Sequence, residues 1–180
     1  PEVSVKMMVS TGGLHGIFKV EGERVRCTRT RYFDDVWKDS CVEFFVQPRM
    51  DRGYFNFEFN CGGAFLCSYV TDPTRTPGGG LKALEKVSER EARAIRVQPS
   101  LPPVFDPQAT EPLGYTLTFF IPLSLFTPYV GAVSARPGER WSCNFYKCAE
   151  DVANPHWASW SPVDELNFHL PRCFGHLEFE

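Results

Sequence analysis

Strict alternation of apolar and polar residues constrains this chain more than any other feature of its sequence. In the segment YFNFEFN, residues 54–60, phenylalanine occupies every second position and polar residues stand between. Successive side chains of a strand point to opposite faces, so this pattern predicts a half-buried β-strand. Phe55, Phe57 and Phe59 then face a core, and the polar residues lie on the other face.

Similar short runs, bounded by glycine, proline and aspartate, recur along the chain and predict antiparallel strands. About ten such strands are too many for one flat sheet, so we expect an all-β fold. Its architecture is an antiparallel β-sandwich, jelly-roll-like, with two packed sheets. The predicted strands cover residues 3–9, 16–20, 25–28, 41–46, 54–60, 64–70, 95–98, 115–121, 141–148 and 174–179.

Helices are expected to be few. Only residues 81–94 suggest one, where Ser88 can cap a short turn that leads into Glu89 and Glu91, so we expect at most one or two short helices. The proline-rich segments 71–80 and 99–112 are expected to be loops, because proline cannot donate to a ladder. Neither resembles a domain linker, and 180 residues with 43% hydrophobic content can bury one sizeable core, which predicts a single domain over residues 1–180.

Charge and motif content argue against several classes of function. The net charge is −3, and the basic residues are scattered, so nothing resembles a stripe that follows a phosphate backbone. No apolar run approaches the ~20 residues of a membrane-spanning helix. We therefore expect neither nucleic acid nor a membrane as partner. The chain has no phosphate-binding glycine loop, nucleophile elbow or zinc-binding histidine pair. A glycosidase with two carboxylates from different strands stays open as an alternative, although a small sandwich offers little substrate enclosure.

The chain has seven cysteines, so at least one thiol has no disulfide partner. The closest pairs, Cys61 with Cys67 and Cys143 with Cys148, do not have the two-residue spacing of zinc or redox motifs. We expect buried, reduced thiols that pack as small apolar groups.

The most informative segment is YFDDVWKDSCVEFFV, residues 32–46, in which four acids surround one tryptophan. If the extended conformation reaches back to Trp37, then Trp37, Asp39, Cys41 and Glu43 share one face, opposite a core-facing set of apolar residues. The hairpin that follows brings a second strand alongside, and this strand adds three polar residues to the same face: Asn56, Glu58 and Asn60.

Aromatic, carboxylate and amide groups on one face are suited to sugars. A pyranose ring has an apolar C–H face that stacks on an aromatic ring, and its hydroxyl rim takes hydrogen bonds. The alternative is that Trp37 covers an edge of the core and that the acids are surface charge.

Two segments resemble family 9 carbohydrate-binding modules. VWKDSCVEFFVQP resembles their motif of tryptophan, aspartate-serine and glutamate, including the separation of Trp37 from Glu43. SWSPVDELNFHLPRCFGHLEF, residues 159–179, is similar to the end of those modules, where a second tryptophan precedes a phenylalanine-glycine pair. Residues 141–147 resemble the penultimate core strand, so the resemblance spans nearly the whole chain.

The resemblance implies a non-catalytic module that holds a mono- or oligosaccharide between two aromatic walls. In that family the sugar so held is the one at the end of a chain. It assigns one wall to Trp37, a hydroxyl-binding carboxylate to Glu43 and the second wall to Phe168, where the family has tryptophan. Trp160 or Trp157 would compensate for the smaller ring, and the other would be core. The further polar candidates for the rim are Asn144, Lys147, Asn167 and His169.

The resemblance also bears on cofactors and context. Some members carry structural calcium, for which Asp34, Asp35 and Asp39 are candidate oxygen ligands, and no other cofactor is expected. Such a module is expected to be appended to a glycan-active enzyme, and a scaffolding domain of such an enzyme is an alternative. A haem-binding or electron-transfer domain of the wider superfamily is another, and it needs an axial pair such as methionine and histidine. The family favours a secreted or cell-envelope location, whereas reduced thiols favour a reducing one, and the sequence does not decide between them.

Overall fold

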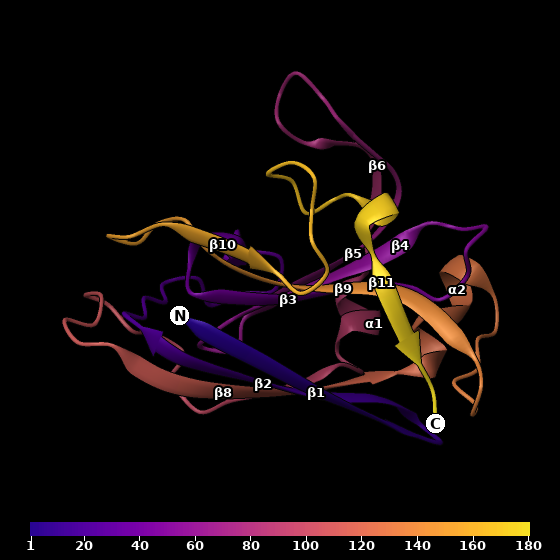
Figure 1. The fold of residues 1–180 in the computed structure, drawn as a ribbon, viewed down its shortest axis with the longest axis horizontal. Coiled ribbons are helices and arrows are strands. Elements are labelled where there is room, and N and C mark those ends of the chain that lie inside the picture. Colours follow the sequence, from indigo (N-terminus) through magenta and orange to yellow (C-terminus); the bar gives the residue numbers. More distant parts are fainter.

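The computed structural model describes residues 1–180, and its strands form two antiparallel sheets that pack face to face (Figure 1). The smaller sheet has four strands in the order β1-β2-β8-β7. These strands are β1 (Glu2–Ser10), β2 (Gly13–Glu23), β8 (Leu113–Pro122) and β7 (Arg96–Pro99). The predicted all-β sandwich is confirmed.

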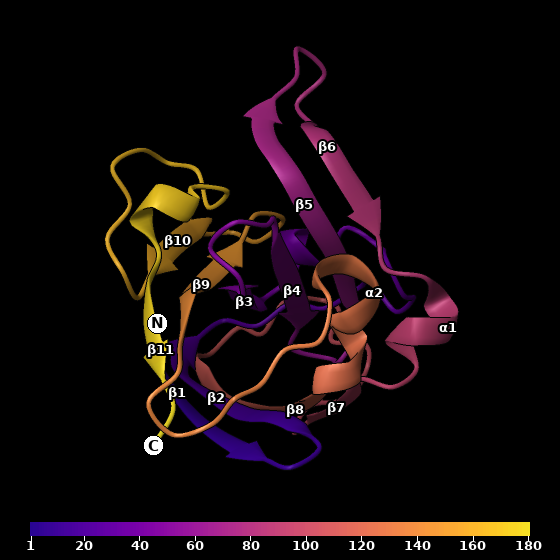
Figure 2. The same cartoon turned by 90° about the vertical axis from the view of Figure 1, so that its right-hand side faces the viewer.

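The larger sheet has seven strands, six of them in the order β10-β9-β3-β4-β5-β6, and β11 pairs with β9 beside β10. Figure 2 shows the β5–β6 hairpin projecting beyond the body of this sheet, on the side away from the smaller sheet. The segment between β10 and β11 rises on the same side. The strands are β3 (Cys41–Gln47), β4 (Tyr54–Asn60), β5 (Phe65–Arg75), β6 (Leu81–Lys86), β9 (Arg140–Ala149), β10 (His156–Ser159) and β11 (Gly175–Glu178).

Helices are short, as expected. The two α-helices are α1 (Glu89–Ala92) and α2 (Thr127–Val130), and three 3-10 turns are η1 (Val36–Lys38), η2 (Leu123–Leu125) and η3 (Pro171–Cys173). Neither α-helix has the length and hydropathy that crossing a bilayer requires.

The main core lies between the two sheets and is built largely of phenylalanine. Phe44 of β3 stacks on Phe145 of β9 with ring centroids 5.0 Å apart, and Phe59 of β4 stacks on Phe119 of β8 at 5.3 Å. These rings occupy the alternate positions that the sequence pattern assigned to the core. All seven residues of β3 and of β4 are nevertheless buried, so the outer face of the larger sheet is covered as well.

Several predicted elements differ from the structure. Residues 81–94 are not one helix, because 81–86 pair with β5 as strand β6, and only Glu89–Ala92 are helical. The predicted cap is correct, since Ser88 and Glu91 form a capping box. Strand β5 continues through the predicted loop as far as Arg75. Residues 25–28 form only a single bridge, between Cys27 and Phe105. The sequence analysis missed β10 and α2.

The cysteines are unpaired, as the composition suggested. All seven are free thiols, and six of them are buried.

A buried ion pair joins the two sheets. Lys147 of β9 donates to Glu23 Oε1 of β2 at 2.9 Å, and both side chains are only 1% exposed. Lys147 shares the parity of Phe145 and so points between the sheets. The expectation that Lys147 lies at a sugar rim on the outer face is therefore corrected.

This ion pair allows a test of the fold. Lys147→Met removes the cation and leaves Glu23 buried beside His156, whose Nε2 lies 3.5 Å from Glu23 Oε1 and whose pKa is lowered by burial, so we expect urea unfolding at neutral pH to show a loss of about 3–5 kcal/mol. The double variant Glu23→Gln, Lys147→Met buries no charge and should regain most of that stability. A loss below about 1 kcal/mol in the single variant, the range of a surface substitution, would contradict the structure.

Candidate functional site

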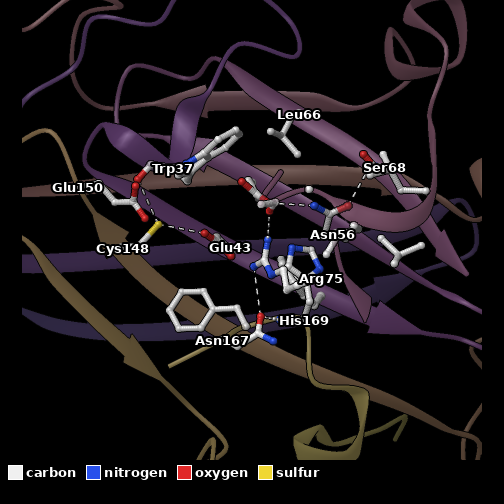
Figure 3. Close-up of a pocket in the computed structure, with 18 of the residues that line it drawn as sticks. Trp37, Glu43, Asn56, Leu66, Ser68, Arg75, Cys148, Glu150, Asn167 and His169 are labelled. Carbon is white, nitrogen blue, oxygen red and sulfur yellow. Dashed lines mark hydrogen bonds between the residues drawn. The ribbon is translucent and has the colours of Figure 1, made fainter. Parts of the chain in front are cut away.

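A cavity of about 620 Å³ opens on the outer face of the larger sheet (Figure 3). Strands β3, β4, β5 and β9 form its floor. Its walls come from η1, from the β5–β6 hairpin, from β10 and from the segment that precedes η3. Eight of the residues named as candidates from the sequence line it together: Trp37, Glu43, Asn56, Glu58, Trp157, Asn167, Phe168 and His169.

Two carboxylates occupy the floor. Glu43 of β3 and Glu58 of β4 are direct cross-strand partners and are 3% and 6% exposed. Asn56 Nδ2 donates to Glu58 Oε1 at 2.8 Å, and its Oδ1 accepts from the backbone N–H of Ser68 at 3.2 Å. The amide is thereby fixed by its two neighbours. Glu58 Oε2 is buried without a protein partner, so it is free to bond a ligand.

Burial controls the protonation of both acids. It raises the pKa of Glu58 to about 7, against the hydrogen bond from Asn56, which lowers it. Burial also raises the pKa of Glu43 well above its usual value, and the neighbouring thiol of Cys148 adds to this. Cys148 Sγ lies 3.0 Å from Glu43 Oε1. Such carboxyl groups can donate as well as accept hydrogen bonds.

Aromatic rings supply the walls. The sequence analysis assumed that Trp37 is extended, but it lies in the 3-10 turn η1. Its ring nevertheless lines the cavity. Phe168 stacks on Tyr146 with ring centroids 4.1 Å apart and planes at 13°. Figure 3 shows Trp37 on one side of Glu43, and Asn167 with His169 on the other.

A second tryptophan lines the cavity, and it is Trp157 and not Trp160. Trp157 lies on β10 opposite Cys148 and is 42% exposed. Trp160 lies outside the cavity, packed over Gly175, where an added Cβ would sit 2.5 Å from the indole Cζ3. The expectation that one of the two is core is wrong, because Trp160 is 55% exposed.

Residues that the sequence analysis did not select complete the walls. Arg75 of β5 donates to Gly79 O at 3.0 Å and to Asn167 Oδ1 at 3.2 Å, which ties the hairpin to the opposite wall. Phe33 also lines the cavity and holds a positive φ of 69°, a conformation that is costly for a bulky residue and is often found at functional sites. No local signal marks Arg75 as a wall residue, because its contact across the cavity is with Asn167, 92 residues away in the sequence.

His169 is held as a neutral side chain. Its Nδ1 lies 2.7 Å from the hydroxyl of Tyr54, which anchors the wall segment to β4. Burial lowers the pKa of His169 to about 3, and the nearby Arg75 adds to this. His169 therefore lines the cavity and also holds the wall segment in place through its hydrogen bond to Tyr54.

Two other predicted polar residues hold loops and do not line the cavity. Asn144 exchanges two hydrogen bonds with the backbone of Ser161, at 3.0 and 2.8 Å. Asn60 donates to Arg29 O at 2.8 Å and accepts from Ala64 N at 2.9 Å. Both are fully buried, so their polar atoms are used by the fold.

The three aspartates do not fit a calcium site. Asp35 pairs with Lys38 at 2.9 Å, and Asp34 accepts from the backbone N–H of Arg31 at 3.0 Å. Asp39 is buried and pairs with a guanidinium instead of lying beside Trp37. Calcium needs several oxygens directed at one point, whereas each of these carboxylates is directed at a separate donor.

Acid should destabilise the protein through His169. Its folded pKa of about 3 lies below the ordinary 6.5, so the unfolded chain binds a proton that the folded chain does not, and stability falls as pH drops below 6.5. Between neutral pH and about pH 4.5, the loss in urea unfolding should be roughly 2 kcal/mol larger for the wild type than for His169→Gln. Equal losses in the two proteins would contradict a partly buried imidazole that is held neutral.

A β-sandwich with a cavity of aromatic rings and hydrogen-bonding carboxyl groups has the features of a carbohydrate-binding module. The chain belongs to carbohydrate-binding family 9, whose sequence model matches residues 1–179. This is a family of non-catalytic binding modules.

Solved structures agree with this assignment. A protein from Bacteroides uniformis, to which carbohydrate binding has been ascribed, is 32% identical with a TM-score of 0.85, over 100% of this chain and 79% of that chain. A family 9 module from Caldicellulosiruptor kristjanssonii in complex with glucose gives a TM-score of 0.56 at 14% identity, over 99% of this chain and 76% of that chain. A family 9 module from the same organism in complex with cellotriose gives a TM-score of 0.55 at 13% identity, over 100% of this chain and 76% of that chain. The last two likenesses concern the fold alone. No curated protein matches the chain.

Proposed function

We propose that this chain binds a mono- or oligosaccharide in the cavity on its larger sheet and leaves the sugar chemically unchanged. The observation that carries the proposal is the unpartnered oxygen of Glu58, buried on a floor beneath aromatic walls. A sugar hydroxyl can bond this oxygen while the C–H face of the ring rests on an indole.

The arrangement of the walls indicates that tryptophan rings, more than Phe168, stack on the sugar. One face of the Phe168 ring is already stacked on Tyr146, so Phe168 offers at most its other face to a ligand. Trp37 and Trp157 carry larger rings and are partly exposed toward the same cavity. We assign stacking mainly to these two indoles, with Phe168 as a third wall and with Glu43, Asn56, Glu58 and His169 as the hydrogen-bonding groups.

A glycosidase with two carboxylates is the alternative from a different class. The chain belongs to a family of non-catalytic modules, which favours binding over hydrolysis. Burial raises the pKa of both Glu43 and Glu58, and a protonated carboxyl group can donate a hydrogen bond to a sugar hydroxyl as well as accept one. None of the three methionines lines this cavity, whereas Met7 and Met8 line a separate pocket on the smaller sheet together with His15, so the haem alternative concerns that pocket and not the proposed sugar site.

The stacking role is tested by calorimetry with glucose and cellotriose, the sugars held by the Caldicellulosiruptor kristjanssonii modules. Affinities of exposed sugar sites are roughly millimolar to micromolar, −4 to −8 kcal/mol. Trp37→Ala should weaken binding at least about tenfold, which is about 1.4 kcal/mol.

Trp160→Ala is the matched control for Trp37→Ala, because it removes an exposed indole that lies outside the cavity. Its affinity should equal that of the wild type. An undiminished affinity in Trp37→Ala, or an equal loss in Trp160→Ala, would place the sugar elsewhere.

The carboxyl role is tested by Glu58→Gln, which keeps the shape of the side chain. The variant replaces a carboxyl oxygen by an NH₂ group that cannot accept, so we expect sugar affinity to fall about tenfold. Thermal stability should not decrease, since an amide has no charge to bury. Full affinity in this variant would remove Glu58 from the site.

We also propose that the module serves a larger glycan-active protein by holding it on a sugar. If the module is part of such an enzyme, we expect its deletion to lower activity on polymeric glycans that the module binds more than activity on small soluble substrates. Turnover assays on both kinds of substrate measure this difference.

A further inference from the structure

Three metal-ligating side chains converge at one end of the cavity floor. The sulfurs of Cys41 and Cys148 and a carboxylate oxygen of Glu43 all lie within 4.8 Å of one another. All three residues are buried, and Glu43 and Cys148 also line the cavity.

Strand register brings these groups together. Cys41 of β3 is the direct partner of Cys148 on β9, and Glu43 lies two residues further along β3, on the same face. The Glu43 carboxyl has a thiol as its hydrogen-bonding neighbour and no cation, because the adjacent Lys147 points to the other face and pairs with Glu23. A buried acid beside two thiols forms a ligand set that a cation would complete.

We propose that Cys41, Glu43 and Cys148 bind one zinc ion, with a fourth coordination position that faces the cavity. Zinc takes thiolate and carboxylate ligands in a tetrahedron, and sites with three protein ligands keep one position open for water or a ligand oxygen. A sugar hydroxyl in the cavity is one such oxygen, but binding of the ion itself does not depend on the sugar.

Zinc would require a small movement of these side chains. Bonds of about 2.3 Å to sulfur and 2.0 Å to oxygen separate a tetrahedral sulfur and oxygen by roughly 3.5 Å and two sulfurs by roughly 3.8 Å. Cys148 Sγ lies 3.0 Å from Glu43 Oε1, so these two atoms must move apart by about half an ångström, and the second sulfur already lies within 4.8 Å of both. Binding releases the thiol protons and the carboxylic acid proton to solvent, and the two thiolates and one carboxylate then carry three negative charges against two on the ion.

Cobalt is the first probe, because thiolate bonds to Co²⁺ absorb in the near ultraviolet. Reduced, chelator-stripped protein is titrated with Co²⁺ alone, and Zn²⁺ is then added to displace it. We expect the absorption to saturate at about one ion per chain, to disappear on addition of zinc, and to be abolished in Cys148→Ser and in Cys41→Ser.

Controls separate this site from the other thiols. Cys61→Ser alters another buried thiol, and Cys173→Ser alters the partly exposed one, so both variants should bind cobalt as the wild type does. Glu43→Gln should weaken binding at least about tenfold while both thiolate bonds remain visible. Circular dichroism of each variant shows that it folds, and the wild-type titration does not depend on any variant.

Three results would overturn the proposal. One is wild-type protein that binds no cobalt or zinc. Another is absorption that persists in a folded Cys148→Ser protein. The third is a native protein, isolated without reductant, in which Cys41 and Cys148 are joined as a disulfide.

Discussion

Burial of the larger sheet on both faces is the constraint on which the rest of this structure depends. Its inner face packs against the smaller sheet, while its outer face is covered by the β5–β6 hairpin and by the segment between β10 and β11 (Figure 1). Three hydrogen bonds fix that segment to the sheet. Asn144 and Tyr146 of β9 each donate to a backbone carbonyl of the segment, and His169, which belongs to the segment, bonds the hydroxyl of Tyr54 on β4. The cavity exists because these loops are held above the strands.

The same burial sets the chemistry of the floor. The loops remove water from carboxyl groups that would be ionised at a surface, and this burial raises the pKa of Glu43 well above its usual value and that of Glu58 to about 7. A buried oxygen without a partner is costly, and a ligand that supplies a hydroxyl removes that cost. Partly exposed indoles at the walls supply the apolar contact that a hydroxyl alone does not. Family membership and this arrangement point to the same class of ligand.

Local pattern predicted the floor of the site better than its walls. Alternation along residues 54–60 correctly placed Asn56 and Glu58 with Glu43, because strand parity is a local property. Three residues apart on one strand, Asn144 and Lys147 point to opposite faces, and the structure uses Lys147 in the core and Asn144 as a loop anchor. Trp157 and Arg75 could not be found this way, since β10 pairs with β9 and the hairpin reaches Asn167 only through long-range packing. Residues 81–86 became a strand for the same reason, as pairing with β5 outweighed their local preference.

The most direct test of a sugar site on this face is an NMR titration that follows the indole N–H signals of the four tryptophans. Addition of cellotriose should shift the signals of Trp37 and Trp157, which line the cavity, and leave those of Trp141 and Trp160 in place. Shifts confined to Trp160, or four signals that do not move at saturating sugar, would contradict the account.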